Sequence, residues 1–186
     1  MSYYFSLDDL RREMADSHLY SRRFEEMLTF KLNNLKELCG RLPGPREAFF
    51  IETKKSFTAF TFIVYLIKHA GRVRHLYIAT YSTNERILNA LLRWRERGLI
   101  DSIHLHVSET LQFRMPKIFA RLVELHHAGV LTLSYSWSHK KITCLDTEAG
   151  FFVVEDSGNY GENAMEEQYV FLQDRNVYEF HSRRIG

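Results

Sequence analysis

The sequence predicts an α/β domain whose mixed, largely parallel sheet is flanked by helices. Short apolar segments of the kind found in buried strands alternate with longer segments whose apolar residues recur every three or four positions. Glycine or proline follows several of these segments, as expected where helices end. Because strands that alternate with helices form sheets with parallel neighbours, we expect one such domain over residues 45–186.

Residues 1–44 are expected to form a separate helical extension. A capping pattern near Ser6 predicts a first helix, and a second is expected from about Ser21 to Cys39. A proline- and glycine-containing segment then predicts a linker into the domain. The apolar stripe that favours the second helix consists of Phe24, Leu28, Leu32, Leu35 and Leu38.

Within the domain, each element follows from its apolar pattern and the residues that end it. Ligands of such sheets bind beyond the carboxyl ends of the strands, and Tyr81-Ser82 and Ser108-Glu109 follow two of those ends. The expected order is strand 48–51, helix 56–69, strand 75–80, a helix ending at Gly98, strand 102–107, helix 116–127, strand 130–137, hairpin strands 142–145 and 151–154, strand 168–172 and a closing helix 176–184.

Composition excludes several classes of protein. Hydrophobic residues make up 45% of the chain and aromatic residues 14%, which favours a packed core over disorder. The formal net charge of +2 gives no overall electrostatic signature of nucleic-acid binding, so phosphate contacts would be local. Cys39 and Cys144 lie far apart without a CxxC motif, which fits a reducing cytosol. Neither a membrane-spanning run nor a signal peptide is predicted, so we expect a cytoplasmic protein without a membrane partner.

Polar residues gather around the predicted hairpin, whose strands flank a Thr-Glu-Ala-Gly turn. Side chains two positions apart on a strand share a face, so His139 and Lys141 are expected to point the same way. Ser157 and Asn159 have the same spacing just past the second strand. If the strands pair, an imidazole, an ammonium, a hydroxyl and an amide converge. Such a set suits attack on a phosphate, with donors for its oxygens.

The order of these residues resembles the phospholipase D superfamily, often called the HKD family. Its pattern H-x-K-x4-D is matched by His139, Lys141 and Asp146. Residues 156–159 (Asp-Ser-Gly-Asn) are similar to its G-S-x-N, with aspartate at the glycine position, and an acid, Glu167, follows before a strand. Nine residues lie between Asp146 and Asp156, where the family pattern has six between its aspartate and its glycine. The difference indicates a longer hairpin tip. The resemblance spans about residue 48 to the C-terminus.

The resemblance implies a role for each matching residue. His139 would be the nucleophile and form a phosphohistidine, while Lys141 and Asn159 would bind the non-bridging phosphate oxygens. Ser157 would donate a hydrogen bond within the site. Glu167 would hold the other ring nitrogen of His139.

The resemblance leaves Asp146 to orient the hairpin, through a salt bridge rather than by touching phosphate. It implies no metal and no other cofactor, because lysine and asparagine supply what a cation would.

The implied mechanism also needs a second histidine, and this chain has one H-x-K only. Short members with a single motif form homodimers whose two motifs face each other, and they are typically nucleases. The resemblance therefore implies a homodimer acting on DNA or RNA. A phospholipid-cleaving member is less expected without an amphipathic membrane-binding stretch. The basic residues available for phosphate contacts are Arg22, Arg23, Lys54, Lys55, Arg72, Arg74, Arg93, Arg95 and Arg97.

A second hypothesis is a binding or regulatory module that keeps the fold and has lost turnover. Asp156 motivates it, because a carboxylate at the glycine position would oppose an anionic substrate unless it points away or pairs with a base.

Other candidate residues favour structural roles. His104 and His106 lie two apart on a strand, but no third metal ligand is spaced near them. His126-His127 closes a helix, where imidazolium suits the dipole. Trp94 and Trp137 are expected in the core, although Trp137 is close enough to His139 to line the pocket.

Overall fold

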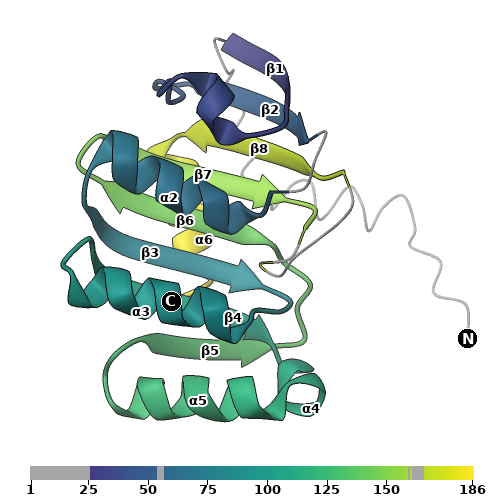
Figure 1. The fold of residues 1–186 in the computed structure, drawn as a ribbon, viewed down its shortest axis with the longest axis vertical. Helices are drawn as coiled ribbons and strands as arrows, with labels where there is room; N and C mark the ends of the chain where they lie inside the picture. The colour runs from purple at the N-terminus through teal and green to yellow at the C-terminus, as the bar shows by residue number, and fades with distance from the viewer. Residues whose placement is uncertain (1–25, 54–56, 159, 161–165) are drawn as a thin grey trace, which may run out of the picture.

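The computed structural model describes residues 26–53, 57–158, 160 and 166–186, which form one eight-stranded sheet with helices on both faces (Figure 1). The strands are β1 (Glu26–Leu32), β2 (Glu47–Thr53), β3 (Val73–Thr80), β4 (Ile100–Ser108), β5 (Thr132–Ser136), β6 (Ile142–Thr147), β7 (Gly150–Asp156) and β8 (Gln168–Gln173). The helices are a 3-10 turn η1 (Leu35–Leu38) and α2 (Ala59–Ala70), α3 (Glu85–Glu96), α4 (Leu111–Arg114), α5 (Pro116–His127) and α6 (Arg175–Ser182).

The strand order is β1-β2-β8-β7-β6-β3-β4-β5. Three of the seven pairings are parallel, namely β1–β2, β3–β4 and β4–β5. The other four are antiparallel, because the β6–β7 hairpin and β8 lie between the two parallel groups. The predicted α/β class and mixed sheet are confirmed, but the expectation of a largely parallel sheet is wrong. The sequence shows that strands alternate with helices. It does not show that the hairpin inserts between the two groups of parallel strands.

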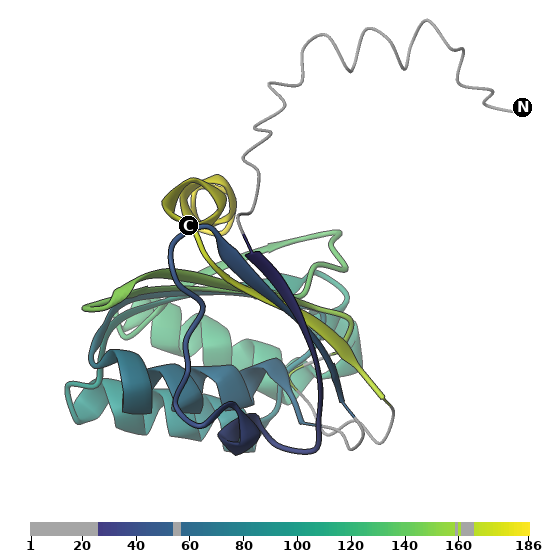
Figure 2. The ribbon, with the colours of Figure 1, turned by 90° about the horizontal axis from the view of Figure 1, so that it is seen from above.

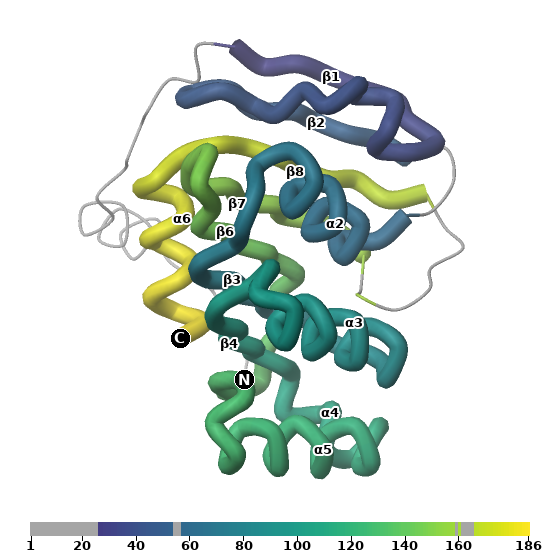
Figure 3. The backbone as a smooth tube through the Cα atoms, turned by 60° about the vertical axis from the view of Figure 1, so that its left-hand side comes forward, coloured from purple at the N-terminus to yellow at the C-terminus, as the bar shows by residue number. Residues whose placement is uncertain are grey.

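The helices divide into two layers. Viewed from above, α2, α3 and α5 lie under the sheet, while α6 lies over its other face (Figure 2). Figure 3 shows α2, α3 and α5 in a row and α6 set apart from them. Each layer has its own apolar cluster, the larger one centred on α2 and including Phe49, Phe62 and Phe171. The cluster under α6 is smaller and includes Cys144, Val153 and Tyr178. Strand β6 is buried along its whole length because both layers cover it.

The N-terminal part of the described chain differs from the prediction. The helix expected from Ser21 to Cys39 is wrong over the described residues, which form β1 and η1. Leu28, Phe30 and Leu32 are two apart and turn toward the core, and the Phe30 ring meets Phe49 at 5.1 Å. Since β1 pairs with β2, residues 26–44 join the sheet unit. The first predicted helix lies outside the described residues.

The elements from β2 onward lie close to their predicted positions. Helix α5 has the predicted bounds, and α3 begins after Asn84, whose side-chain oxygen accepts from the Ile87 N–H at 3.0 Å. Helix α4 was not predicted, because four residues are too few for a periodic pattern. Within the described residues, no helix is long and apolar enough to cross a bilayer.

One edge of the sheet collects the residues singled out by the sequence. Strands β2, β3, β4, β5 and β7 end at this edge and β6 and β8 begin there, as the strand pairings require (Figure 1). We refer to it as the site edge. The segment from β5 to β6 carries the H-x-K motif along it, and the end of β7 and the start of β8 bring the second half of the motif to it. Topology therefore joins parts of the pattern that are far apart along the chain.

Candidate active site

His139 and Lys141 lie in contact at the site edge. The Lys141 Nζ is 2.9 Å from His139 Nδ1 and 3.3 Å from the His139 carbonyl oxygen. The two residues precede β6 rather than lying on a strand, so the prediction of a shared strand face is wrong. The bend of the segment makes the contact instead. Because an ammonium only donates, Nδ1 accepts in this arrangement, which leaves the proton of a neutral ring on Nε2.

Tyr81 and Arg114 extend this cluster. Tyr81 follows β3, and its ring lies 4.7 Å from the His139 ring between centroids. The Arg114 guanidinium lies over the same Tyr81 ring, 4.5 Å from its centroid. The position of Tyr81 after a strand was noted from the sequence, but no role was assigned to it. Arg114 was missed, because it belongs to the short helix α4 that the sequence pattern does not reveal.

Ser157 and Glu167 form a second, hydrogen-bonded part of the site, in which Glu167 is buried and Ser157 is exposed. The Ser157 hydroxyl donates to the Glu167 carboxylate and accepts from the Gln168 N–H at 3.2 Å. Glu167 is 7% exposed, and its backbone is bound to Thr53 at the end of β2, with the Glu167 N–H 2.9 Å from Thr53 Oγ1. Gly158 permits the close approach of this carboxylate, since an added Cβ would lie 3.0 Å from the carboxyl carbon. Asn159 lies outside the described residues.

Asp156 links the two halves of the site. It ends β7, and its N–H donates to the Lys141 carbonyl oxygen at 3.2 Å. Both carboxyl oxygens are buried, and neither makes a well-formed hydrogen bond. Burial raises the pKa of Asp156 to about 8; the Lys141 charge and the Gly158 N–H act against this rise, and the Glu167 carboxylate adds to it. At neutral pH this side chain is therefore mainly an uncharged acid.

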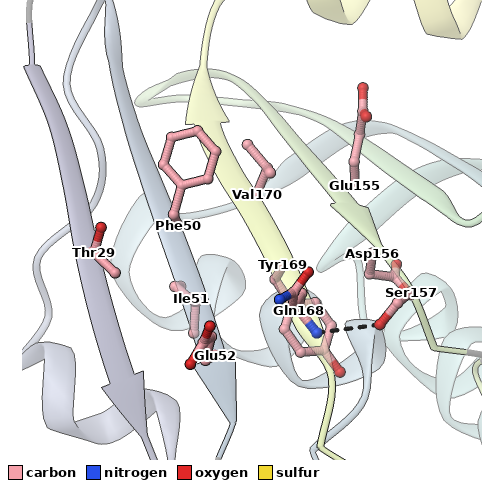
Figure 4. Close-up of a pocket in the computed structure, with 10 residues that line it drawn as sticks. All are labelled: Thr29, Phe50, Ile51, Glu52, Glu155, Asp156, Ser157, Gln168, Tyr169 and Val170. Atoms are coloured by element: carbon pink, nitrogen blue, oxygen red, sulfur yellow. Dashed lines mark hydrogen bonds between the residues drawn. The ribbon is translucent and has the colours of Figure 1, made fainter.

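A pocket of about 440 Å³ lies beside Ser157, between β1, β2, β8 and β7 (Figure 4). Asp156 and Ser157 are at one end of it, and Phe50 and Val170 supply apolar walls. It is a space next to Ser157 in which part of a substrate can lie. The lining residues are Thr29, Phe50, Ile51, Glu52, Glu155, Asp156, Ser157, Gln168, Tyr169 and Val170.

Asp146 is not brought to the other motif residues. It lies near the hairpin tip of β6, where its Oδ1 accepts from Arg74 Nε at 3.1 Å and also from Arg74 Nη2. Arg74 Nη2 further donates to the Thr147 carbonyl oxygen at 2.9 Å. Asp146 is five positions beyond Lys141 along an extended strand, which corresponds to roughly 16 Å. Its contacts are those of a residue that holds the hairpin.

The histidines of β4 have structural partners. His106 is 8% exposed, and its ring nitrogens lie 2.9 Å from Ser134 Oγ and 3.0 Å from Ser136 Oγ. His104 stacks on Tyr77 with 4.3 Å between ring centroids. Burial lowers the pKa of both histidines. Among the residues that the structure describes, no three His, Cys, Asp or Glu side chains gather as metal ligands.

The two tryptophans differ in their surroundings. Trp94 packs against the core and stacks on Phe60 with 5.0 Å between ring centroids. Trp137 is 80% exposed, so its predicted place in the core is wrong. It follows an edge strand whose last residues, Tyr135 and Ser136, are exposed as well, and none of the described elements covers it. Of the predicted phosphate-binding residues, Arg22, Arg23, Lys54 and Lys55 lie outside the described residues.

Comparison with known proteins gives similarity of fold alone. No family model and no curated protein sequence matches the chain. Among solved structures, the polyphosphate kinase from Porphyromonas gingivalis aligns with a TM-score of 0.54 and 16% identity, over 74% of this chain and 25% of that one. TrmBL2, an archaeal chromatin protein described with a novel mode of DNA binding, aligns with a TM-score of 0.43 and 14% identity, over 74% of this chain and 50% of that one. The chain thus spans a quarter and a half of these proteins. The first similarity supports the α/β fold of this chain and does not assign it to a family.

Proposed function

We propose that the chain is a metal-independent phosphodiesterase, a nuclease that hydrolyses DNA or RNA through a phosphohistidine. The observation that carries the proposal is the contact between His139 Nδ1 and Lys141 Nζ, exposed at the site edge. A nucleophile and a cation side by side are what attack on a phosphodiester requires. The fold similarity supports the resemblance at the level of the fold, and the chemistry rests on these residues.

The reaction has two displacements at phosphorus. In the first, a ring nitrogen of His139 attacks the phosphorus, a P–N bond forms, and the bond to the leaving oxygen breaks. A general acid protonates that oxygen. In the second, water attacks the same phosphorus, loses a proton to a base, and the P–N bond breaks to return free His139. Lys141 stabilises the charge that develops on the non-bridging oxygens, and Asn159 is proposed to do the same.

Substrate binding would have to rearrange the His139–Lys141 contact. With Nδ1 accepting from Lys141, Nε2 carries the proton of the neutral ring and has no lone pair for attack. An anionic phosphate oxygen is a stronger acceptor for the ammonium than a ring nitrogen. Transfer of Lys141 to the phosphate would release Nδ1 to take the proton, and Nε2 would become the nucleophile. Glu167 is proposed to stabilise that tautomer.

The acid of the first step and the base of the second would come from a second copy of the chain. The sequence holds one H-x-K motif, and no second histidine belongs to the described cluster around His139. A two-fold axis at the site edge would place His139 of the partner subunit opposite. We therefore propose that the active form is a homodimer with one shared site.

The test is cleavage of end-labelled DNA and RNA oligonucleotides in the presence of EDTA. The wild type should cleave, and His139→Ala should lose activity by a factor of about 10⁴ or more, as when a nucleophile is removed. The matched control is His127→Ala, an exposed histidine at the end of α5, which should cleave like the wild type. Activity that strictly requires a divalent metal would refute the mechanism, and an active form that is a strict monomer would refute the shared site.

A binding module without turnover is the second candidate, and Asp156 is the residue that favours it. Its carboxyl group lies where the superfamily pattern has glycine, and when ionised it would add negative charge beside a phosphate. Binding of oligonucleotides in a gel-shift assay, with no cleavage at any pH between about 5 and 9, would support this candidate.

A further inference from the structure

Large aromatic side chains are exposed around His139. Trp137 is 80% exposed and Phe113 is 79% exposed, and Tyr81 contacts the His139 ring. We call these three residues the aromatic rim. Neither the Trp137 ring nor the Phe113 ring packs against another aromatic ring in the described part of the chain. Single exposed apolar side chains are common on protein surfaces, so it is the position of these rings next to His139 that points to a binding surface.

The backbone brings the aromatic rim to the site edge. Glu109, at the end of β4, donates its N–H to the Ser136 carbonyl oxygen at 2.8 Å, so the start of the α4 segment lies beside the end of β5. Phe113 is four residues beyond Glu109, and Trp137 is one residue beyond Ser136. His139 follows Trp137 by two residues. The rim thus borders the proposed nucleophile on the side of the edge strand.

Cations accompany the rings. Arg114 lies over Tyr81 and is exposed, and Lys140 and Lys117 are exposed nearby along the same segments. Arg114 makes no ion pair with another described residue. Glu109 is the acidic residue among them and is half-buried. Aromatic rings interleaved with unpaired cations are the surface that binds single-stranded nucleic acids, because every base has a π-face and every nucleotide a phosphate.

We propose that the aromatic rim stacks unpaired bases of a single-stranded nucleic acid whose backbone passes His139. The proposal rests on the proposed function and specifies its substrate as a single strand. In a duplex both faces of each base are covered by neighbouring pairs, so Trp137 and Phe113 would find no base to stack on. In a single strand the bases turn away from the backbone, and Arg114 and Lys140 can meet the phosphates.

The test separates binding from cleavage by using His139→Ala protein, which cannot turn over. Fluorescence anisotropy would compare labelled single strands of about 12 nucleotides with the matching duplex. Single strands should bind more tightly. Adding Trp137→Ala should raise the Kd for the single strand by about fivefold or more, while Trp137→Phe, which keeps a ring, should restore most of the affinity. Binding should also quench the fluorescence of Trp137.

Phe180→Ala is the matched control, because Phe180 is 52% exposed but lies on α6 at the other face of the sheet (Figure 2). It should leave the Kd unchanged. Equal affinity for duplex and single strand, or an unaltered Kd for Trp137→Ala, would overturn the inference even if the wild type cleaves DNA or RNA. Rim-dependent binding without cleavage by the wild type would instead uphold the inference and refute the proposed function.

The same variants test two other possible occupants of the aromatic rim, a membrane and a second copy of the chain. If the rim inserts into a membrane, Trp137 fluorescence should shift to shorter wavelength with anionic phosphatidylserine vesicles, and oligonucleotides should not compete. If the rim joins two copies of the chain, Trp137→Ala should lower the mass measured by light scattering. The resulting monomers should then bind single-stranded oligonucleotides with the wild-type Kd. Either result would overturn the proposal.

Discussion

The two halves of the candidate site differ in how the protein holds them. His139 and Lys141 lie in an exposed or half-exposed segment and are positioned mainly by each other and by Tyr81. Ser157 and Glu167 lie at strand ends and are tied by hydrogen bonds to β2 and β8. We infer from this difference that the exposed half can change partners, whereas the hydrogen-bonded half, Ser157 and Glu167, keeps its geometry. Each half can be perturbed without the other.

The largest effect tests the exposed half through Lys141. Lys141→Ala should lower kcat for DNA or RNA cleavage by about 10² to 10³, the usual effect of removing one donor to a developing oxyanion. Lys141→Arg should recover part of this loss, since it keeps the charge. Lys68→Ala, an exposed lysine on α2, is the control. A wild-type kcat for Lys141→Ala would contradict the role of Lys141 at phosphate.

The hydrogen-bonded half should show a smaller effect, with a distinct signature. Glu167→Gln weakens a charge-assisted hydrogen bond to Ser157, and such bonds contribute about 1.5–3 kcal/mol, so kcat should fall by about 10- to 100-fold. Ser157→Ala removes the same bond from its other end. Because the two residues act through one contact, the double variant should be no slower than the slower single variant. If the two losses multiply, the residues act separately and the hydrogen-bonded half is not one unit.

Asp156, between the halves, predicts a pH dependence. Its pKa in the folded protein is raised to about 8 by burial, whereas the unfolded chain releases this proton near its ordinary pKa of about 4. Between these values the folded state holds one more proton, so stability falls as pH rises from about 4 to about 8, by at most about 1.4 kcal/mol per pH unit, and levels off above that. Cleavage should also decline above pH about 8, as the carboxylate adds negative charge beside the phosphate site.

Asp156→Asn should remove both trends, because an amide does not ionise. Urea unfolding of the two proteins at several pH values measures the first trend, and initial rates of oligonucleotide cleavage measure the second. If the stability of the wild type instead rises between pH about 4 and about 8, the Asp156 carboxyl group is ionised in the folded protein. That result would favour the hypothesis of an inactive binding module.

Elements of the fold differ in how well the sequence predicts them. The hairpin of β6 and β7, helix α5 and strand β8 follow from apolar patterns and turn residues, which act locally. Strand β1 does not, because Leu28 and Leu32 fit a period of two as well as a period of four, and its pairing with β2 decides the outcome. The number of parallel pairings is likewise a property of the whole sheet.

For the site, the sequence supplies residue types and spacing but not contacts. The sequence indicates His139 and Lys141 as site residues. Their contact depends on a bend in the chain, which an alternating strand pattern does not predict. The exposure of Trp137 was missed because an indole usually predicts burial, whereas Trp137 follows β5, which lies at the sheet edge. The burial of the Asp156 carboxyl group also depends on packing against neighbouring strands.

The smallest expected effect concerns Asp146, which belongs to the sequence motif but to neither half of the site. Asp146→Asn should change kcat by less than about threefold, because groups this far apart without shared partners act independently. The change should appear in stability instead, as a lower Tm, since the Asp146 carboxylate is 8% exposed and neutralising it weakens its bonds to Arg74 at the hairpin tip. Arg74→Gln should lower Tm in the same way and leave kcat unchanged. If Asp146→Asn abolishes cleavage at wild-type Tm, the aspartate acts on the reaction, and the hairpin tip must be counted with the site edge.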